Sequence, residues 1–292
     1  DVATTAGLPC EGVEVRVALP VGAIRRNMAR LDLRNHRKLC VVDGKVAYTG
    51  SHNLVEASYG RRDLLWHDLT SRLEGPIVLD LQAVFCGDWH FETGEMLEGP
   101  HLYPTPSVAG DVAAQVLPSG PNYPTGNYQR LVVAALHTAK KHVSITTPYF
   151  VPDEAFLQAM HTAALRGVEV DLIVPKRFDQ ILAGNATRAY FEDALEAGVH
   201  LHRFLPGLLH AKTMLIDDKM ALIGSSNFDI RSFMLNFEIN MVFYDPGVVS
   251  ELRRHHRVYR EHSYELTLEQ WQSRPKAKQV LQNVVRLLSP VL

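Results

Sequence analysis

The pattern of an 18-residue stretch, 36–53, recurs at 210–227, and this repeat constrains the chain more than any other feature. The first copy reads HRKLCVVDGKVAYTGSHN and the second reads HAKTMLIDDKMALIGSSN, and they align without a gap. A given residue type recurs by chance at about one position in twenty, so eight identities are not coincidence. The matching residues are His36 and His210, Lys38 and Lys212, Asp43 and Asp217, Lys45 and Lys219, Ala47 and Ala221, Gly50 and Gly224, Ser51 and Ser225, and Asn53 and Asn227.

The length of 292 residues suits two domains, because a single domain commonly has about 100–200 residues. We place these domains at 1–111 and 112–292, with the Pro- and Gly-rich segment 99–111 as the connection. The second part carries several elements ahead of its motif copy, where the first has only about a dozen residues. We therefore expect the first repeat to lack most of its opening strands and helices, as in a fragment.

Helical and strand patterns alternate between residues 112 and 204, which is typical of βαβ units on a parallel sheet. The predicted class is α/β, with two repeats that each form a mainly parallel mixed sheet flanked by helices. The expected helices cover 75–91, 127–142, 153–167 and 178–198, and the expected strands include 143–150 and 168–175.

The composition excludes several classes of protein. A formal net charge of -2 gives no global attraction to nucleic acid, so no nucleic-acid partner is expected. Three cysteines are too few for a disulfide framework, and Cys40, within an apolar strand, is expected to be a buried thiol. No run of 18 apolar residues occurs, so the sequence predicts no membrane-spanning helix.

The repeated polar residues suit phosphoryl transfer. His36 and Lys38 lie two apart on a strand and therefore point to one face, as do His210 and Lys212. One histidine is expected to attack phosphorus while the other protonates the leaving oxygen, so a single site is assembled from both repeats. Further donors for the phosphate are expected from Ser51, Asn53, Ser225 and Asn227.

Other chemistries fit the motif poorly. The HxK spacing lacks the His or Cys partners of a tetrahedral metal site, and lysine repels a cation, so no metal and no cofactor are predicted. The sequence has no GxSxG turn of a serine hydrolase and no P-loop.

Four acidic residues accompany the two motif copies. A catalytic histidine commonly needs an acceptor on its second ring nitrogen, and Asp68 and Glu238 follow the two motifs on apolar strands. We predict that each orients one histidine, although an ordinary strand carboxylate is an equally good interpretation. Asp43 and Asp217 end a strand at a tight turn, which by itself favours a structural role.

The two motif copies resemble the signature of the phospholipase D superfamily, HxKxxxxD followed by GSxN. The longer stretches TTPYFVPDE and GLLHAKTMLIDDKMALIGSSNFDIRSFMLNFEIN look like bacterial cardiolipin synthases, and this similarity covers nearly the whole chain. The resemblance implies two phospholipase D-like repeats, with His36 as the nucleophile and His210 as the acid and base. It also implies that the catalytic set contains His36, Lys38, Asp43, His210, Lys212 and Asp217.

The same resemblance implies an activity, partners and a location. Two phosphatidylglycerol molecules would be converted to cardiolipin and glycerol through a phosphohistidine, at the bacterial inner membrane and in contact with anionic phospholipids. Members of this family usually begin with membrane-spanning segments and a full first repeat, and both are missing from this sequence. The alternatives are a phosphodiesterase that hydrolyses phospholipid or nucleic acid, and a membrane-binding scaffold, which has no need of a nucleophile.

Two further segments bear on membrane contact. Arg25, Arg26, Arg30 and Arg34 lie in the loop before the first motif, and are expected to form a cationic lip or a solvated loop. At the C-terminus an apolar helical stripe is expected to pack on the domain rather than lie on a membrane, and consists of Val280, Leu281, Val284, Val285, Leu287 and Leu288.

Overall fold

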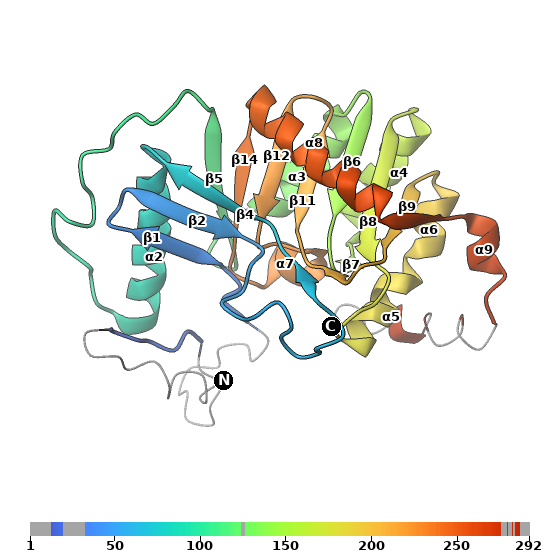
Figure 1. Ribbon diagram of the computed structural model, residues 1–292, viewed down its shortest axis with the longest axis horizontal. Coiled ribbons are helices and arrows are strands. Elements are labelled where there is room, and N and C mark those ends of the chain that lie inside the picture. The colour runs from blue at the N-terminus through green and yellow to red at the C-terminus, as the bar shows by residue number, and fades with distance from the viewer. Residues whose placement is uncertain are drawn as a thin grey trace.

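An eight-stranded mixed sheet forms the centre of the computed structural model, which describes residues 13–19, 33–123, 126–275, 279, 282 and 284–286 (Figure 1). The strands lie in the order β15–β9–β8–β6–β11–β12–β14–β5. Their bounds are β5 (Ala114–Ser119), β6 (His142–Thr146), β8 (Glu169–Pro175), β9 (His200–Phe204), β11 (Thr213–Ile216), β12 (Met220–Gly224), β14 (Glu238–Phe243) and β15 (Ser263–Leu266).

The α/β class is confirmed, but the expectation of a mainly parallel sheet is wrong. Only β6, β8 and β9 run parallel to one another, where helices connect successive strands. The other neighbours in this sheet run antiparallel, and of these pairs only β11 and β12 are joined directly by a tight turn. The turn between β11 and β12 contains Asp217, whose φ of 51° is left-handed, as is the φ of 54° at Asp43 in the first repeat.

Helices cover both faces of the sheet (Figure 1). One face packs against α3 (Asn127–Thr138), α4 (Glu154–Leu165), α5 (Ile181–Ala189) and α6 (Phe191–Glu196). The other packs against α2 (Ile77–Thr93) and α8 (Pro246–Glu261), while α7 (Ile230–Met234) and α9 (Leu268–Gln272) are short. The helices expected at 75–91, 127–142 and 153–167 are confirmed, whereas 178–198 forms two helices that meet at Tyr190.

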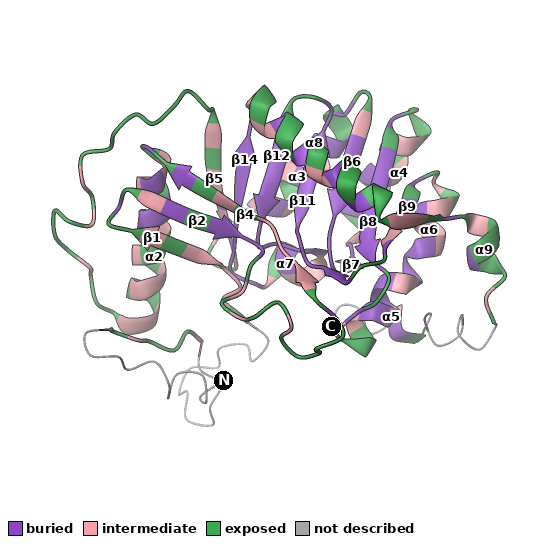
Figure 2. Cartoon of the chain, viewed as in Figure 1, coloured by how far each residue is buried: buried purple, intermediate pink, exposed green. Residues whose placement is uncertain are grey.

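Burial on both faces explains the apolar strands of the second repeat. In β11, Met214 and Ile216 belong to the core beneath the helices α3 and α4, and Leu215 belongs to the core on the opposite face. Figure 2 shows the central strands buried along their length. A strand buried on both faces has no polar side to present, so it reads as a continuous apolar run.

The first repeat contributes a smaller antiparallel sheet, with the strand order β1–β2–β4. It is built from β1 (Leu39–Val42), β2 (Val46–Gly50) and β4 (Thr70–Glu74). By the motif alignment, β1 and β2 correspond to β11 and β12, and β4 pairs with β2 as β14 pairs with β12. Ala47 and Leu73 of this sheet pack with Ile239 and Met241 of the large sheet, so the repeats share one core.

The repeated glycine is explained by close packing. A Cβ at Gly50 would lie 2.7 Å from the Cα of Thr70, and one at Gly224 would lie 2.7 Å from the Cα of Asn240. Backbone atoms of the adjacent strand cannot move aside as a flexible side chain does. Only glycine therefore fits at this position in either repeat.

Two further pairs of short strands run parallel. One joins β3 (Trp66–His67) to β10 (Leu208–Leu209), and the other joins β7 (Phe150–Val151) to β13 (Phe228–Asp229). Since β3 belongs to the first repeat and β10 to the second, this pair ties the two together next to their motifs.

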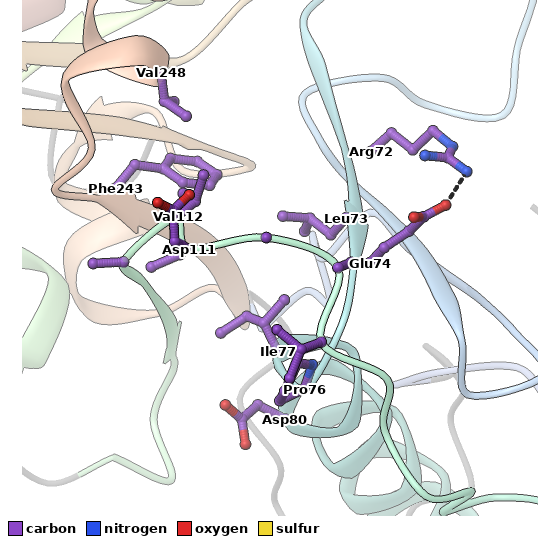
Figure 3. Close-up of a pocket in the computed structure, with 15 residues that line it drawn as sticks. Arg72, Leu73, Glu74, Pro76, Ile77, Asp80, Asp111, Val112, Phe243 and Val248 are labelled. Atoms are coloured by element: carbon purple, nitrogen blue, oxygen red, sulfur yellow. Dashed lines mark hydrogen bonds and ion pairs between the residues drawn. The ribbon is translucent and has the colours of Figure 1, made fainter.

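A cavity of about 710 Å³ lies where the small sheet meets the edge of the large one. Figure 3 shows Leu73 and Ile77 from the first repeat facing Phe243 and Val248 from the second, with an ion pair between Arg72 and Glu74. None of the repeated histidines or lysines lines it, so the chemistry lies elsewhere.

Several expectations about peripheral residues are settled by the described parts of the chain. Cys40 is exposed rather than buried, because it points away from the core in the alternating pattern of β1. Arg34 is described and exposed, while Arg25, Arg26 and Arg30 lie outside the described residues. In the C-terminal stripe Val285 is buried and Val284 is 52% exposed, and the other four members are outside the description. Among the described helices, none is long and apolar enough to cross a bilayer.

Candidate active site

The two motif copies meet at the sheet edge where β6 and β8 end (lower edge in Figure 1). Before the first motif, Asn35 bridges Phe237, and the backbone N–H of His36 donates to the Phe237 carbonyl at 2.8 Å. Before the second motif, the N–H of His210 donates to the His67 carbonyl at 2.9 Å. Each histidine thus follows a backbone segment that pairs with the other repeat.

His36 is held by a buried carboxylate. Its Nδ1 lies 2.9 and 3.0 Å from the two carboxylate oxygens of Glu238, which is fully buried. Burial by itself raises the pKa of Glu238, but the opposing effects of His36, Lys38 and the Ser225 hydroxyl leave that pKa below its usual value. Glu238 is therefore ionised at neutral pH and accepts a hydrogen bond from the N–H at Nδ1, which leaves Nε2 of His36 for a substrate.

His210 has the same arrangement with the other carboxylate. Its Nδ1 lies 2.6 Å from Oδ1 of Asp68, and its ring centroid lies 4.5 Å from that of Trp66. Burial, and then Lys212, lower the pKa of His210 to about 3 in spite of Asp68. The pKa of Asp68 is about 2, since hydrogen bonds from His210 and Ser51 outweigh the effect of burial. In the free protein His210 is therefore a neutral imidazole.

The pairs are crossed between the repeats. Glu238 follows the second motif but contacts the first histidine, and Asp68 follows the first motif but contacts the second histidine. Sequence reasoning paired each carboxylate with one histidine without specifying which. The crossing follows from the backbone pairings described above, because residues 35 and 237 are neighbours, as are residues 67 and 209.

Ser51 and Ser225 support these carboxylates. The Ser51 hydroxyl donates to Asp68 at 2.7 Å and accepts from the N–H of Leu69 at 2.9 Å. The Ser225 hydroxyl donates to Glu238 at 2.5 Å and accepts from the N–H of Ile239 at 2.9 Å. A hydroxyl has one proton to donate, and in this structure both serines direct it to a carboxylate. A phosphate contact for either serine stays a prediction.

Two lysines place positive charge in the site. Nζ of Lys38 donates to the carbonyl of His36 at 2.7 Å, and Nζ of Lys212 donates to that of His210 at 2.6 Å. Burial lowers the pKa of Lys38 to about 8, although Glu238 and Asp68 oppose the change. Burial, and then the proximity of Lys38, hold the pKa of Lys212 well below its usual value. Two desolvated ammonium groups near one another favour the binding of an anion.

The asparagines of the two motifs differ in setting. Asn227 is 8% exposed and lines a cavity of about 190 Å³ together with His36, while Asn53 is half-buried in the first repeat. The structure thus brings Asn227 next to one histidine, and a phosphate contact for either asparagine stays a prediction.

Asp43 and Asp217 lie away from the histidines. Each sits at the hairpin turn at the far end of its strand, β1 or β11. The Asp217 carboxylate accepts backbone N–H groups of Lys140, Lys141 and His142 at 2.8–3.1 Å. These contacts support a structural role for Asp217 and no direct part in the reaction.

The sequence analysis missed several residues that shape the site. Ser232 and Asn236 donate to Glu238 at 2.9 and 3.3 Å. Arg37 donates to the carbonyls of Glu238 and Ser119 and pairs with Asp88 of α2. None of these contacts is repeated between the two motif copies, and that repeat was the only signal that the sequence offered.

A group that could ligate a metal lies elsewhere, and consists of His142, Glu169 and Asp171. Nη1 of Arg260 lies 2.5 Å from Oδ2 of Asp171, the same oxygen that faces His142. A guanidinium already neutralises this carboxylate, so the group is better described as an ion-pair network than as a metal site.

The comparisons with known proteins agree with this geometry. Residues 132–257 match the family described as cardiolipin synthase, PLD-like domain. These residues therefore carry the sequence pattern of a phospholipase D-like domain. The resemblance to bacterial cardiolipin synthases of the phospholipase D superfamily is thereby confirmed.

Two similar proteins carry the name cardiolipin synthase A. That of Pectobacterium carotovorum subsp. carotovorum (strain PC1) is 40% identical over 288 residues, and that of Proteus mirabilis (strain HI4320) is 39% identical over 291 residues. Each match covers 96% of this chain, and the chain spans 59% of the relative's length.

A solved structure shows the same fold. The phosphatidylserine synthase of Haemophilus influenzae Rd KW20 superposes with a TM-score of 0.67 at 14% identity, over 89% of this chain and 72% of that one. The fold shared with that structure therefore extends beyond residues 132–257.

The crossed contacts predict a pattern of energetic coupling. In double-mutant cycles on the free energy of unfolding, His210→Ala with Asp68→Asn, and His36→Ala with Glu238→Gln, should each couple by about 1–3 kcal/mol. The matched pairs within one repeat, His36 with Asp68 and His210 with Glu238, should couple by less than about 0.5 kcal/mol. Urea unfolding of the intact protein measures these energies, and equal coupling in both sets would contradict the assignment.

The electrostatics of Lys38 predict a titration in an accessible range. Lys38 should lose its proton near pH 8, so its positive charge is present below that pH and absent above it. Asp68→Asn should lower this pKa, because the Asp68 carboxylate stabilises the ammonium. NMR of ¹³C-labelled lysine measures the midpoint, with Asp111→Asn, in the cavity of Figure 3, as the control. An unchanged midpoint in Asp68→Asn would rule out the coupling.

Proposed function

We propose that the protein is a phosphatidyltransferase that converts two molecules of phosphatidylglycerol to cardiolipin and glycerol. The observation that carries the proposal is the joining of two oriented histidines with the half-buried Lys38 and the buried Lys212 in one site. Relatives named cardiolipin synthase A at about 40% identity support the choice of substrate.

In the proposed first step, Nε2 of His36 attacks the phosphorus of one phosphatidylglycerol. The bond from phosphorus to the glycerol oxygen breaks, and Nε2 of His210 supplies the proton to that oxygen. Because the pKa of His210 is about 3 in the free protein, its protonation requires the negative charge of the bound phosphodiester. The lysines stabilise the charge that builds up on the phosphoryl oxygens.

In the second step, a hydroxyl of another phosphatidylglycerol attacks the phosphohistidine. His210 takes the hydroxyl proton, the bond between His36 and phosphorus breaks, and cardiolipin leaves. Asp68 and Glu238 keep each imidazole in the tautomer that presents Nε2. The lysines provide the positive charge that a metal supplies in other phosphoryl-transfer enzymes, so we expect no cofactor.

The first experiment is an assay of the intact protein with phosphatidylglycerol in detergent micelles. We expect mass spectrometry to show cardiolipin and free glycerol, with activity that survives a chelator. Phosphatidic acid as the sole product would move the protein to the hydrolase alternative with the same catalytic residues. His36→Ala and His210→Ala should each lower the rate by at least about 10³-fold.

The roles of the two histidines are separable with a p-nitrophenyl phosphodiester, whose leaving group needs no protonation. His210→Ala should still release a burst of p-nitrophenol, and His36→Ala should give none. The reverse pattern would exchange the roles.

A lipid surface is proposed as the partner at the mouth of the site, with the bacterial inner membrane as the location. Ile181 is 83% exposed and Leu182 is 47% exposed, and they stand between Gln180 and Ala183, which line the cavity beside His36. Leu65, 50% exposed, directly precedes the Trp66 that packs on His210. Exposed apolar side chains around a lipid-processing site fit contact with a bilayer.

Substitution of Ile181 tests this surface. Ile181→Ser should weaken binding of the intact protein to phosphatidylglycerol vesicles by several-fold, because its apolar area no longer leaves water. Leu165→Ser is a matched control, since Leu165 is 82% exposed at the C-terminal end of α4, at the opposite edge of the sheet. Vesicle sedimentation measures both, and equal effects would count against a defined membrane-facing edge.

A further inference from the structure

The cavity of about 190 Å³ beside His36 has a polar wall whose residues the mechanism above does not fully use. It is formed where β7, α5 and α7 meet, at the same sheet edge as the histidines (Figure 1). Asn227, Asp229 and Asn236 line it together with His36. The last residue, Asn236, belongs to neither motif copy.

The two asparagines share an unusual hydrogen-bonding state. The side-chain amide of Asn236 donates to Glu238 at 3.3 Å, and that of Asn227 donates to Asp229. A carboxylate accepts hydrogen bonds, so these contacts fix the amide nitrogens toward the acids and the carbonyl oxygens away from them. Both carbonyl oxygens, Oδ1 of Asn227 and Oδ1 of Asn236, are buried with no donor among the described residues.

Such oxygens are costly to leave without a donor. Both residues are only 8% exposed, so bulk water does not satisfy them, and a buried acceptor without a partner destabilises a structure. The group that enters this cavity is therefore expected to bring hydrogen-bond donors.

A phosphodiester has no hydrogen to donate, so it cannot supply that group. The wall of the cavity also carries both the carboxyl group of Asp229 and the guanidinium of Arg231, so it does not select for one sign of charge. A neutral polyol has the required donors and no charge.

We propose that Asn227 and Asn236 form a subsite for the glycerol hydroxyls, which binds the glycerol part of the headgroup beside the reacting phosphate. This proposal rests on the proposed function and assigns a place to the leaving glycerol and to the attacking glycerol headgroup. Asn227 retains a second N–H for the phosphate, so its carbonyl and its amide serve different parts of the substrate. Asn236 is the specificity residue that the motifs do not contain.

The subsite acts in a balanced transfer step. A primary hydroxyl of glycerol attacks the phosphohistidine, its oxygen forms the new bond to phosphorus, and the bond from phosphorus to His36 breaks. The hydroxyl proton passes to His210. The remaining hydroxyls of glycerol donate to the asparagine carbonyls and hold the attacking oxygen in place.

Competition between two alcohols tests the subsite. The intact protein is given phosphatidylglycerol in detergent micelles with equal concentrations of deuterated glycerol and 1-propanol, which lacks the two further hydroxyls. Mass spectrometry yields the ratio of deuterated phosphatidylglycerol to phosphatidylpropanol. Both products come from one phosphohistidine, so the ratio is independent of the rate at which that intermediate forms.

Asn236→Ala should lower this ratio at least about fivefold, because glycerol loses one hydrogen bond that 1-propanol does not make. Asn236→Ser, which keeps a hydroxyl able to donate a hydrogen bond, should lower it similarly with less risk to folding. Asn240→Ala is the matched control, because Asn240 also has a buried carbonyl oxygen without a donor but does not line the cavity. The control should leave the ratio unchanged.

The outcomes separate the two proposals. Normal yields with an unchanged ratio in both Asn236 variants would overturn the glycerol subsite and leave the proposed function in place. An equal fall in Asn240→Ala would also overturn it, since the effect would not belong to the cavity. No transfer product from the unsubstituted protein would overturn the proposed function and the subsite together.

Discussion

The crossed contact between each histidine and the carboxylate of the other repeat is the interaction on which the site depends. Glu238 holds His36 and Asp68 holds His210, so neither repeat contains a complete catalytic pair. These crossed contacts are supported by the serines that donate to the carboxylates and by the backbone pairings beside the histidines. Two repeats that share one core are thus also joined through one reaction centre.

Desolvation of the lysines gives this centre its preference for an anion. The change in the pKa of Lys38 from 10.5 to about 8 corresponds to a free-energy cost on the order of 3 kcal/mol for keeping it charged. In the proposed reaction, the negative charge of a phosphodiester would offset this cost. The same charge would raise the pKa of His210, so that the substrate prepares the proton donor for the leaving group.

The cavity beside His36 offers a substrate something that the lysines do not. Its buried asparagine carbonyl oxygens accept hydrogen bonds, while the Asn236 amide is held by Glu238 and the Asn227 amide by Asp229. The proposed headgroup would bring an anionic phosphate to the lysines and hydroxyl donors to these oxygens.

Spacing in the sequence was sufficient to predict most of the helices and strands and to select the histidines and lysines that the structure brings together. The HxK spacing places His and Lys on one face because a strand alternates its side chains, and the repeated glycine marks a contact between backbones. The resemblance to cardiolipin synthases also came from the motif residues alone. These are local properties, which a few consecutive residues determine.

Only the tertiary structure decided which carboxylate serves which histidine, because that depends on pairings between residues 142 and 202 positions apart. It also decided that the hydroxyls of Ser51 and Ser225 donate to carboxylates, and that most strand neighbours are antiparallel. Asn236 carried no motif signal, since its role arises from burial beside Glu238 and from the cavity that α5 and α7 enclose. Burial and long-range pairing belong to the folded chain as a whole, and no short stretch of sequence contains them.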